Sequence, residues 1–80
     1  MKNWYVYMLY CKDSSIYTGI SNNVEKRFLE HTAGKGGRYT RAHGVEKILY
    51  TEFHPSRSEA LKREVEIKGW HREKKLRLMK

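Results

Sequence analysis

The run WYVYMLYC, residues 4–11, is apolar or aromatic at every position and constrains the fold more than any other segment. A strand with apolar side chains on both sides is expected to be buried on both of its faces. The turn-forming residues KDSS (12–15) follow it, and IYTGI (16–20) has the composition of a returning strand. The chain therefore begins as a β-hairpin whose first strand needs cover on both sides.

Two capping signals predict helices in the remainder of the chain. Asn22, with Glu25 three residues later, resembles a capping box, and Ser56 with Glu59 makes a second one. Gly69 is a natural end for the second helix.

The elements expected after the hairpin are a helix over 24–32, a glycine-rich basic loop over 33–44 with one short helical turn near 39–42, a strand over 45–53 in which Ile48 and Tyr50 alternate with Leu49 and Thr51, a helix up to Gly69, and a last short helix over 70–79. The predicted fold class is α+β, a three-stranded antiparallel sheet flanked by helices in the order ββαβαα. We expect it to form a single domain over residues 1–80.

The charge balance favours a polyanionic partner. Lys and Arg number 17 against 9 Asp and Glu, which gives a net charge of +8 on 80 residues. Such a field favours nucleic acid, and a basic surface without a partner is the plainer alternative. The single Cys11 excludes an internal disulfide, and the first residues lack the features of a secretory signal. With no stretch of membrane-spanning length, we expect a cytoplasmic protein that binds no membrane.

Glu64 lies on a helix face that should be apolar. At about 100° per residue it falls about 40° from Ala60, inside an arc that also contains Leu61, Val65 and Ile67. A carboxylate facing the core is costly unless it is paired or binds a metal. Two interpretations stay open: a buried salt bridge to a basic residue of the sheet, or a ligand for a hard cation such as Mg²⁺ at the floor of a cleft.

Arg27 and His31 border the apolar stripe of the first helix, which holds Val24, Phe28 and Leu29. They lie four residues apart and are neighbours on one side of the helix. On an ordinary surface helix they would only extend to solvent. Next to a buried glutamate in a basic protein, they also suit a phosphate clamp and a titratable helper.

Tyr7 and Tyr17 also have two interpretations. Buried tyrosines usually serve only in packing. A nearby cation, however, would lower the pKa of the phenol from about 10 and allow it to act as a base. If both serve one site, their side chains must share a face of the hairpin. In an antiparallel hairpin, the numbers of each pair of opposite residues have the same sum, and residues 7 and 17 share a face only if this sum is even. Direct pairing of residues 11 and 16 would put the tyrosines on opposite faces, so we predict a five-residue loop or a bulge near residues 11–17.

In order, these residues resemble the signature of the GIY-YIG nucleases, a superfamily of some homing endonucleases, excision-repair incision subunits and structure-specific resolvases. Tyr5-Val6-Tyr7 stands at the first tripeptide and Tyr17-Thr18-Gly19 at the second. Arg27 stands at the helix arginine, with His31 four residues later. Glu64, in EALKRE (59–64), stands at the metal-ligand position. The resemblance covers residues 4 to about 78 and is closest to small stand-alone bacterial members, which have tails like IKGWHREKK (67–75).

The resemblance implies a metal-dependent endonuclease for phosphodiester bonds of structured or single-stranded DNA, with one Mg²⁺ or Mn²⁺ held by Glu64. Tyr7 or Tyr17 would act as general base, Arg27 would stabilise the transition state and His31 would relay a proton. DNA is favoured over RNA, and DNA repair is a function that such relatives have. The expected nucleic-acid-binding residues are Gly19, Lys35, Arg38, Tyr39, Arg41, Lys74 and Lys75, although the loop among them could simply be solvated.

Departures from the family pattern favour a second hypothesis. Tyr5 replaces a glycine, and Ile20 stands where many relatives have lysine. Relatives often have an asparagine near the active site at the end of the domain, but no asparagine follows Asn23 here. Lys74 or Lys75 would have to take the role of that asparagine. The alternative is a nucleic-acid-binding module of the same fold that cuts weakly or not at all. A third interpretation, a structural metal protein, is disfavoured because its candidate ligands lack zinc-site spacing. These candidates are His31, His43, His54, His71 and Cys11.

Overall fold

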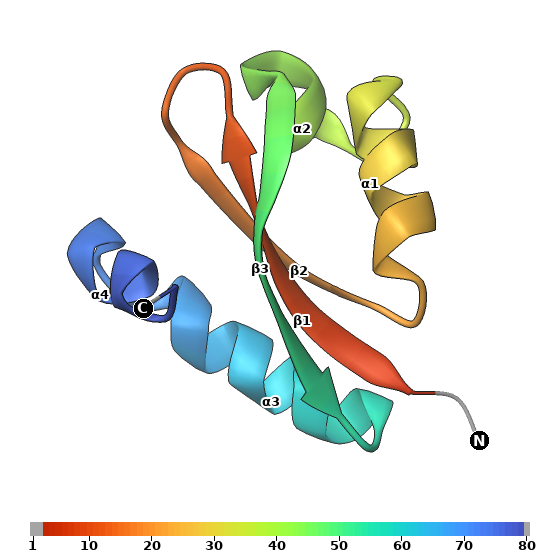
Figure 1. Cartoon of the computed structure of the whole chain (residues 1–80), viewed down its shortest axis with the longest axis vertical. Coiled ribbons are helices and arrows are strands. Elements are labelled where there is room, and N and C mark those ends of the chain that lie inside the picture. Colours follow the sequence, from red (N-terminus) through yellow and green to blue (C-terminus); the bar gives the residue numbers. More distant parts are fainter. Residues whose placement is uncertain (1–2, 80) are drawn as a thin grey trace.

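The computed structural model describes residues 3–79, and its three strands form one antiparallel sheet in the order β2-β1-β3 (Figure 1). The strands are β1 (Trp4–Cys11), β2 (Ile16–Ser21) and β3 (Val45–His54). The helices are α1 (Val24–Thr32), α2 (Arg38–His43), α3 (Arg57–Lys68) and α4 (Arg72–Arg77). The α+β class is confirmed, and α2 is the short helical turn expected in the glycine-rich loop.

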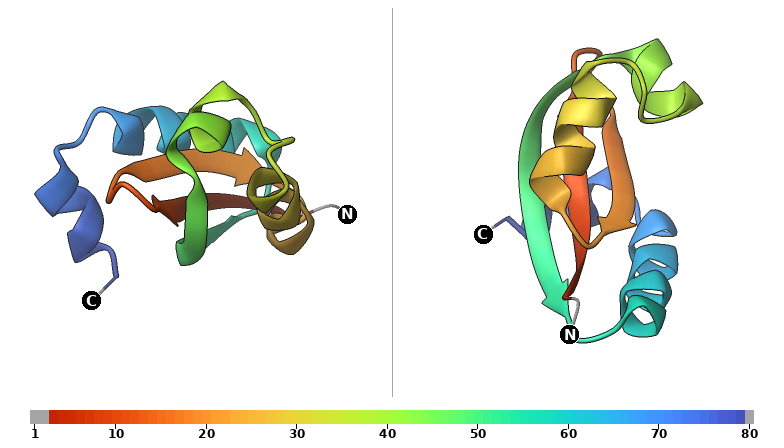
Figure 2. Two further views of the ribbon diagram at one scale, coloured as in Figure 1. Left: turned by 90° about the horizontal axis from the view of Figure 1, so that it is seen from above. Right: turned by 90° about the vertical axis from the view of Figure 1, so that its right-hand side faces the viewer.

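Strand β1 is the centre of the sheet, and its two faces contribute to two different cores. Val6 and Met8 are fully buried in a cluster with residues of α3. Tyr7 and Leu9 point to the opposite face, where Phe28 of α1 packs against them. Figure 2 shows the sheet lying between α1 and α3. Every position of β1 is apolar because both of its faces are covered.

The register of the hairpin confirms the requirement on the two tyrosines. Tyr10 pairs with Ile16, which leaves the five residues 11–15 between them. The same register places Tyr17 opposite Leu9, on the face of the sheet that carries Tyr7. The side chains of both tyrosines therefore point towards α1 and α2, as one site requires.

Strand β3 contains a bulge that the sequence pattern did not indicate. Met8 pairs with Tyr50 but Leu9 pairs with Ile48, so Leu49 is an extra residue on β3. Leu49 and Tyr50 both pack on the α3 side, whereas Ile48 packs on the α1 side. The strict alternation expected for this strand is therefore wrong at residues 48–50.

Helix α1 begins at the expected residue, but its cap is one position later than expected. Oδ1 of Asn23, not of Asn22, accepts a hydrogen bond from the Lys26 N–H at 3.1 Å. The N–H of Asn23 in turn donates to Oγ of Ser21 at 2.9 Å, which fixes the chain between β2 and the helix. Leu29, assigned to the buried stripe, is 64% exposed, and His31 is buried in its place.

Helix α3 has the expected capping box, since Oγ of Ser56 accepts a hydrogen bond from the Glu59 N–H at 3.2 Å. Its buried residues are Ala60 and Ile67. Val65 is 68% exposed, so its assignment to the core face is wrong. The stripe that contacts the sheet is narrower than the predicted arc and excludes the position about 140° from Ala60.

Candidate active site

Three buried side chains from three elements form a hydrogen-bonded chain. The Tyr7 hydroxyl of β1 lies 3.0 Å from Nε2 of His31 in α1. Nδ1 of the same ring lies 2.7 Å from Oγ1 of Thr40 in α2. Each of the three residues is only 1% exposed. A phenol, an imidazole and an alcohol are thus linked in series, and all three are almost fully buried.

Arg27 holds a fixed position next to this chain. Its NH1 donates to a carboxylate oxygen of Glu30 at 3.1 Å, and its NH2 donates to the carbonyl oxygen of Gly36 at 2.9 Å. Burial, followed by the positive charge of Arg27, lowers the pKa of His31 against a smaller opposing effect of Glu30. His31 is therefore neutral near pH 7, and one of its ring nitrogens is an acceptor.

Burial dominates the acidity of Tyr7. It raises the pKa of the Tyr7 hydroxyl, the neighbouring Tyr17 raises it further, and Arg27 opposes this rise. The influence of Arg27 has the expected direction but is smaller than the cost of burying a phenolate. Tyr7 can therefore act as a base only if another group takes its proton, and Nε2 of His31 is at hydrogen-bond distance.

An aromatic row extends from the buried chain towards the surface. The ring of Tyr17 lies 6.2 Å from that of Tyr7 and 5.1 Å from that of His31. On its other side it lies 5.7 Å from Tyr39, whose ring lies 4.2 Å from His43. Tyr39 is 41% exposed and is open to a ligand. The row therefore connects the expected catalytic residues to an expected nucleic-acid contact.

Two glycines provide the space that this packing needs. A Cβ atom on Gly36 would lie 2.0 Å from Nδ1 of His31. A Cβ atom on Gly19 would lie 2.8 Å from the Tyr7 hydroxyl oxygen and 3.0 Å from the Tyr17 ring. Gly19 is one of the expected nucleic-acid-binding residues. In the structure it makes room for the two tyrosines.

A cleft of about 470 Å³ runs along β2 beside the aromatic row. It is lined by Ile16, Tyr17, Thr18, Tyr39, Lys68 and Lys75. The cleft brings the expected catalytic Tyr17 together with two expected nucleic-acid contacts, Tyr39 and Lys75. Within the part of the chain that the structure describes, Oγ1 of Thr18 is a buried polar atom without a hydrogen-bond partner. The cleft thus presents aromatic rings and two cations, and the Thr18 hydroxyl lies buried in its wall.

Glu64 belongs to α3, which covers the face of the sheet opposite to α1. Its side chain is 14% exposed, and a carboxylate oxygen lies 3.4 Å from Nζ of Lys68, four residues later. The expected salt-bridge partner was a residue of the sheet, but the observed partner is on the same helix. Lys68 also lines the cleft, so the ion-pair partner of Glu64 lies beside Tyr17 at the edge of β2.

The donor set near Glu64 suits a cation that keeps most of its water. Among residues 3–79, no group of three or more His, Cys, Asp or Glu side chains could hold a metal ion. Mg²⁺ commonly binds proteins through one or two carboxylates and completes its shell with water and substrate phosphate oxygens. A single partly buried carboxylate beside a cleft fits that mode, provided that the Lys68 ammonium moves aside.

The other expected nucleic-acid contacts lie outside the cleft. Lys35, Arg38 and Arg41 are exposed in the loop and in α2, and none of them lines the cleft. Nζ of Lys74 lies 4.5 Å from the centre of the Trp70 ring. These four cations are called the outer cations below.

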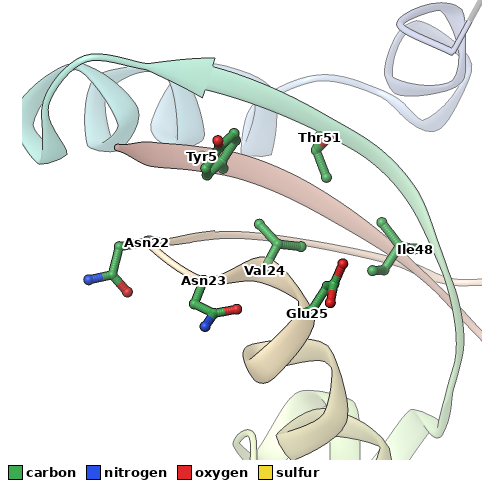
Figure 3. A pocket seen from close by; sticks show the side chains of 7 residues that line it. All are labelled: Tyr5, Asn22, Asn23, Val24, Glu25, Ile48 and Thr51. Carbon is green, nitrogen blue, oxygen red and sulfur yellow. The ribbon is translucent and has the colours of Figure 1, made fainter. Parts of the chain in front are cut away.

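Another hollow, of about 400 Å³, opens beside the start of α1 (Figure 3). It contains none of the expected catalytic residues. Its lining residues are Tyr5, Asn22, Asn23, Val24, Glu25, Ile48 and Thr51.

Sequence reasoning missed three residues of this site. Lys68 could have been found, since a lysine four residues after a core-facing glutamate on one helix is a common pair. Thr40 and Gly36 carry no spacing signal, because their importance depends on how the loop 33–44 folds around the ring of His31.

The fold and the site together define an α+β domain with a tyrosine–histidine–arginine centre beside a basic cleft. The sequence matches the family model described as the GIY-YIG catalytic domain over residues 3–77, and the chain belongs to this family. No helix within residues 3–79 is long and apolar enough to cross a membrane.

Bacterial relatives of similar length match the whole domain. A UPF0213 protein of Staphylococcus haemolyticus is 46% identical over 79 residues, which are 99% of this chain and 96% of the relative. The UPF0213 protein BH0048 from Bacillus halodurans has a solution NMR structure with 45% identity and a TM-score of 0.59, covering 95% of this chain and 81% of that one. The NMR structure of the protein EF2693 from E. faecalis has 38% identity and a TM-score of 0.66. The match covers 96% of this chain and 82% of that one.

Proposed function

We propose that this protein is a metal-dependent endonuclease that hydrolyses phosphodiester bonds of DNA. Membership of the GIY-YIG family supports nuclease chemistry on a nucleic acid. The observation that carries the proposal is the hydrogen bond between the Tyr7 hydroxyl and the buried, neutral His31 next to Arg27. This arrangement supports the proposal because it gives a phenol a route for losing its proton and sets next to it a cation that could bind a phosphate.

The proton moves in two steps. First, Nε2 of His31 accepts the proton of the Tyr7 hydroxyl as the Tyr7 oxygen takes a proton from the water that attacks the phosphorus atom. Second, after cleavage, Tyr7 gives a proton to the leaving oxygen and regains its own proton from His31. The guanidinium of Arg27 faces the negative charge that develops on the phosphate oxygens. Tyr17, in ring contact with both Tyr7 and His31, orients the attacking water.

Glu64 would hold the divalent cation, Mg²⁺ or Mn²⁺, at the β2 edge. When bound, such a cation polarises a non-bridging phosphate oxygen and stabilises the leaving alkoxide. The partly buried carboxylate of Glu64, whose partner Lys68 lines the cleft, supports this placement.

The cleft along β2 would hold the strand that is cut. Tyr39 offers an exposed ring for a base, while Lys68 and Lys75 offer cations for phosphates. The outer cations Lys35, Arg38, Arg41 and Lys74 add attraction through counterion release. DNA is proposed over RNA, in a structured or single-stranded form.

Nicking assays with Mg²⁺ or Mn²⁺ on single-stranded, nicked and branched DNA, and on matched RNA, test this function. We expect wild-type protein to cut at least one DNA form, and Glu64→Ala to lose roughly 100-fold or more in rate while it keeps DNA binding. Glu66→Ala is the matched control, because Glu66 lies on the same helix and is 56% exposed. Equal cutting by wild type and Glu64→Ala would contradict the assigned metal ligand.

A binding module without cleavage is the second candidate. It is favoured by the raised pKa of Tyr7 and by the ion pair that already neutralises Glu64. Its signature in the same assay is binding to DNA with no cutting of any form by the wild-type protein.

A further inference from the structure

Thr40 is the one buried residue of α2. The residues on either side of it, Tyr39 and Arg41, are exposed, and the Thr40 side chain points inward to His31. A buried position of this size would normally suit valine, because an alcohol costs free energy when it leaves water unless it forms a hydrogen bond. The bond of 2.7 Å to Nδ1 of His31 compensates that cost.

We propose that Thr40 is a positioning residue that fixes the tautomer of His31: Oγ1 accepts the hydrogen bond from Nδ1–H, which leaves Nε2 without a hydrogen and ready to accept the Tyr7 proton. Its consequence for catalysis rests on the proposed nuclease function, but the tautomer itself does not.

The relative acidity of the two hydroxyls supports this direction of the hydrogen bonds. A neutral imidazole has one N–H donor and one bare nitrogen acceptor. A phenol is far more acidic than an alcohol, so Tyr7 is the better donor and Thr40 the better acceptor. The pairing with Tyr7 as donor to Nε2 and Thr40 as acceptor from Nδ1 therefore uses each group in its stronger role.

The loop before α2 fits closely around the ring. A Cβ atom on Gly36 would lie 2.0 Å from Nδ1 of His31, so no side chain fits at this position. The carbonyl oxygen of Gly36 accepts a hydrogen bond from Arg27. His31 thus has Tyr7 on one nitrogen, Thr40 on the other and backbone against its edge. A ring enclosed in this way keeps its orientation, so the chemistry of its second nitrogen depends on Thr40.

Nitrogen NMR of ¹⁵N-histidine-labelled protein at neutral pH tests the proposal without any need for nuclease activity. In wild type we expect Nδ1 of His31 to show the shift of a protonated nitrogen and Nε2 that of a bare one. Thr40→Val should move the ring towards the Nε2–H form, whereas Thr40→Ser should keep the wild-type pattern. Thr32→Val is the matched control, because the Thr32 hydroxyl is exposed and bonds only to Leu29 in its own helix.

Kinetics on a cleaved DNA give the second readout. In Thr40→Val we expect kcat to fall roughly 10–100-fold with KM changed less than about twofold, and in Thr40→Ser we expect most of the rate to return. A wild-type His31 with Nε2–H, or a Thr40→Val ring that keeps Nδ1–H, would overturn the proposal. If wild type cuts no DNA while the tautomer depends on Thr40, the nuclease function fails and the positioning role stands.

Discussion

Gly36 serves two neighbours at once, because its carbonyl oxygen holds Arg27 and its missing side chain leaves space for His31. A larger residue here would have to displace either the ring or the loop. The position shows how closely the loop between α1 and α2 is adapted to a single imidazole ring.

Gly36→Ala should therefore be strongly disruptive. The added methyl group would overlap Nδ1 of His31, and overpacking of this kind typically costs about 1–3 kcal/mol. Urea unfolding measures the loss. Gly69→Ala is the control, because its Cβ would meet nothing closer than 3.5 Å, and we expect little change or a small gain. Equal unfolding midpoints for Gly36→Ala and wild type would contradict the packing described.

The lowered pKa of His31 predicts a pH dependence of stability. In the unfolded chain the His31 ring binds a proton near pH 6.5. In the folded protein the lowered pKa means that the same ring binds a proton only at a lower pH. The contribution of neutral His31 to the free energy of unfolding is therefore fully present above pH 6.5. It is lost as the pH falls from there towards the pKa of His31 in the folded protein. Arg27 strengthens this effect and Glu30 weakens it.

Chemical denaturation between pH 7.5 and 5 measures that slope. In His31→Asn, which lacks the titrating imidazole at this position only, we expect a flatter profile than in wild type. The same slope in both proteins would mean that His31 is not held neutral by its surroundings.

The site could be predicted only where residue spacing carries the information. Tyr7, Tyr17, Arg27 and His31 follow a linear order, and the hairpin register with α1 brings three of them into contact. Thr40 reaches its place through the path of a loop, and no periodicity encodes that path.

Helices and strands begin close to where short-range signals put them, because caps and turns act over only a few residues. The cap of α1 is an instructive error. Two adjacent asparagines offer the same side chain, and the bond from the Asn23 N–H to Ser21 decides which of them faces the helix. The bulge at Leu49 likewise has no signal in the sequence, since it depends on how two helices pack against the two faces of β3.

Asn23→Ala should cost about 1 kcal/mol of stability, as the loss of an N-cap usually does, while Asn22→Ala should be close to neutral. Thermal or urea unfolding of the two variants side by side gives the comparison. A larger loss in Asn22→Ala would restore the assignment made from sequence.

At the scale of the whole molecule, the sheet separates the two parts of the candidate site. The tyrosine–histidine centre lies on the α1 face and Glu64 on the α3 face, with the cleft along β2 between them. A substrate strand would have to pass around this edge, so Lys68 and Lys75 should make direct phosphate contacts.

Replacing both lysines by glutamine should therefore reduce the salt dependence of DNA binding. Each lost phosphate contact lowers the slope of log K against log salt by about 0.7–0.9, so the double variant should lose about 1.4–1.8. Fluorescence anisotropy across a salt series measures it. A double variant of Lys47 and Lys62, which are exposed outside the cleft, carries the same change in charge and should keep a slope closer to wild type.

Strand β2 has a single neighbour in the sheet, β1, so the backbone groups along its other side have no strand to pair with. Such an edge can recruit the same edge of a second copy, and charged side chains, lysine especially, are a common means of preventing this. Lys68 and Lys75 lie along this edge, where two copies would bring like charges together. The cations that we assign to a polyanion would thus also keep the protein from polymerising through its own sheet.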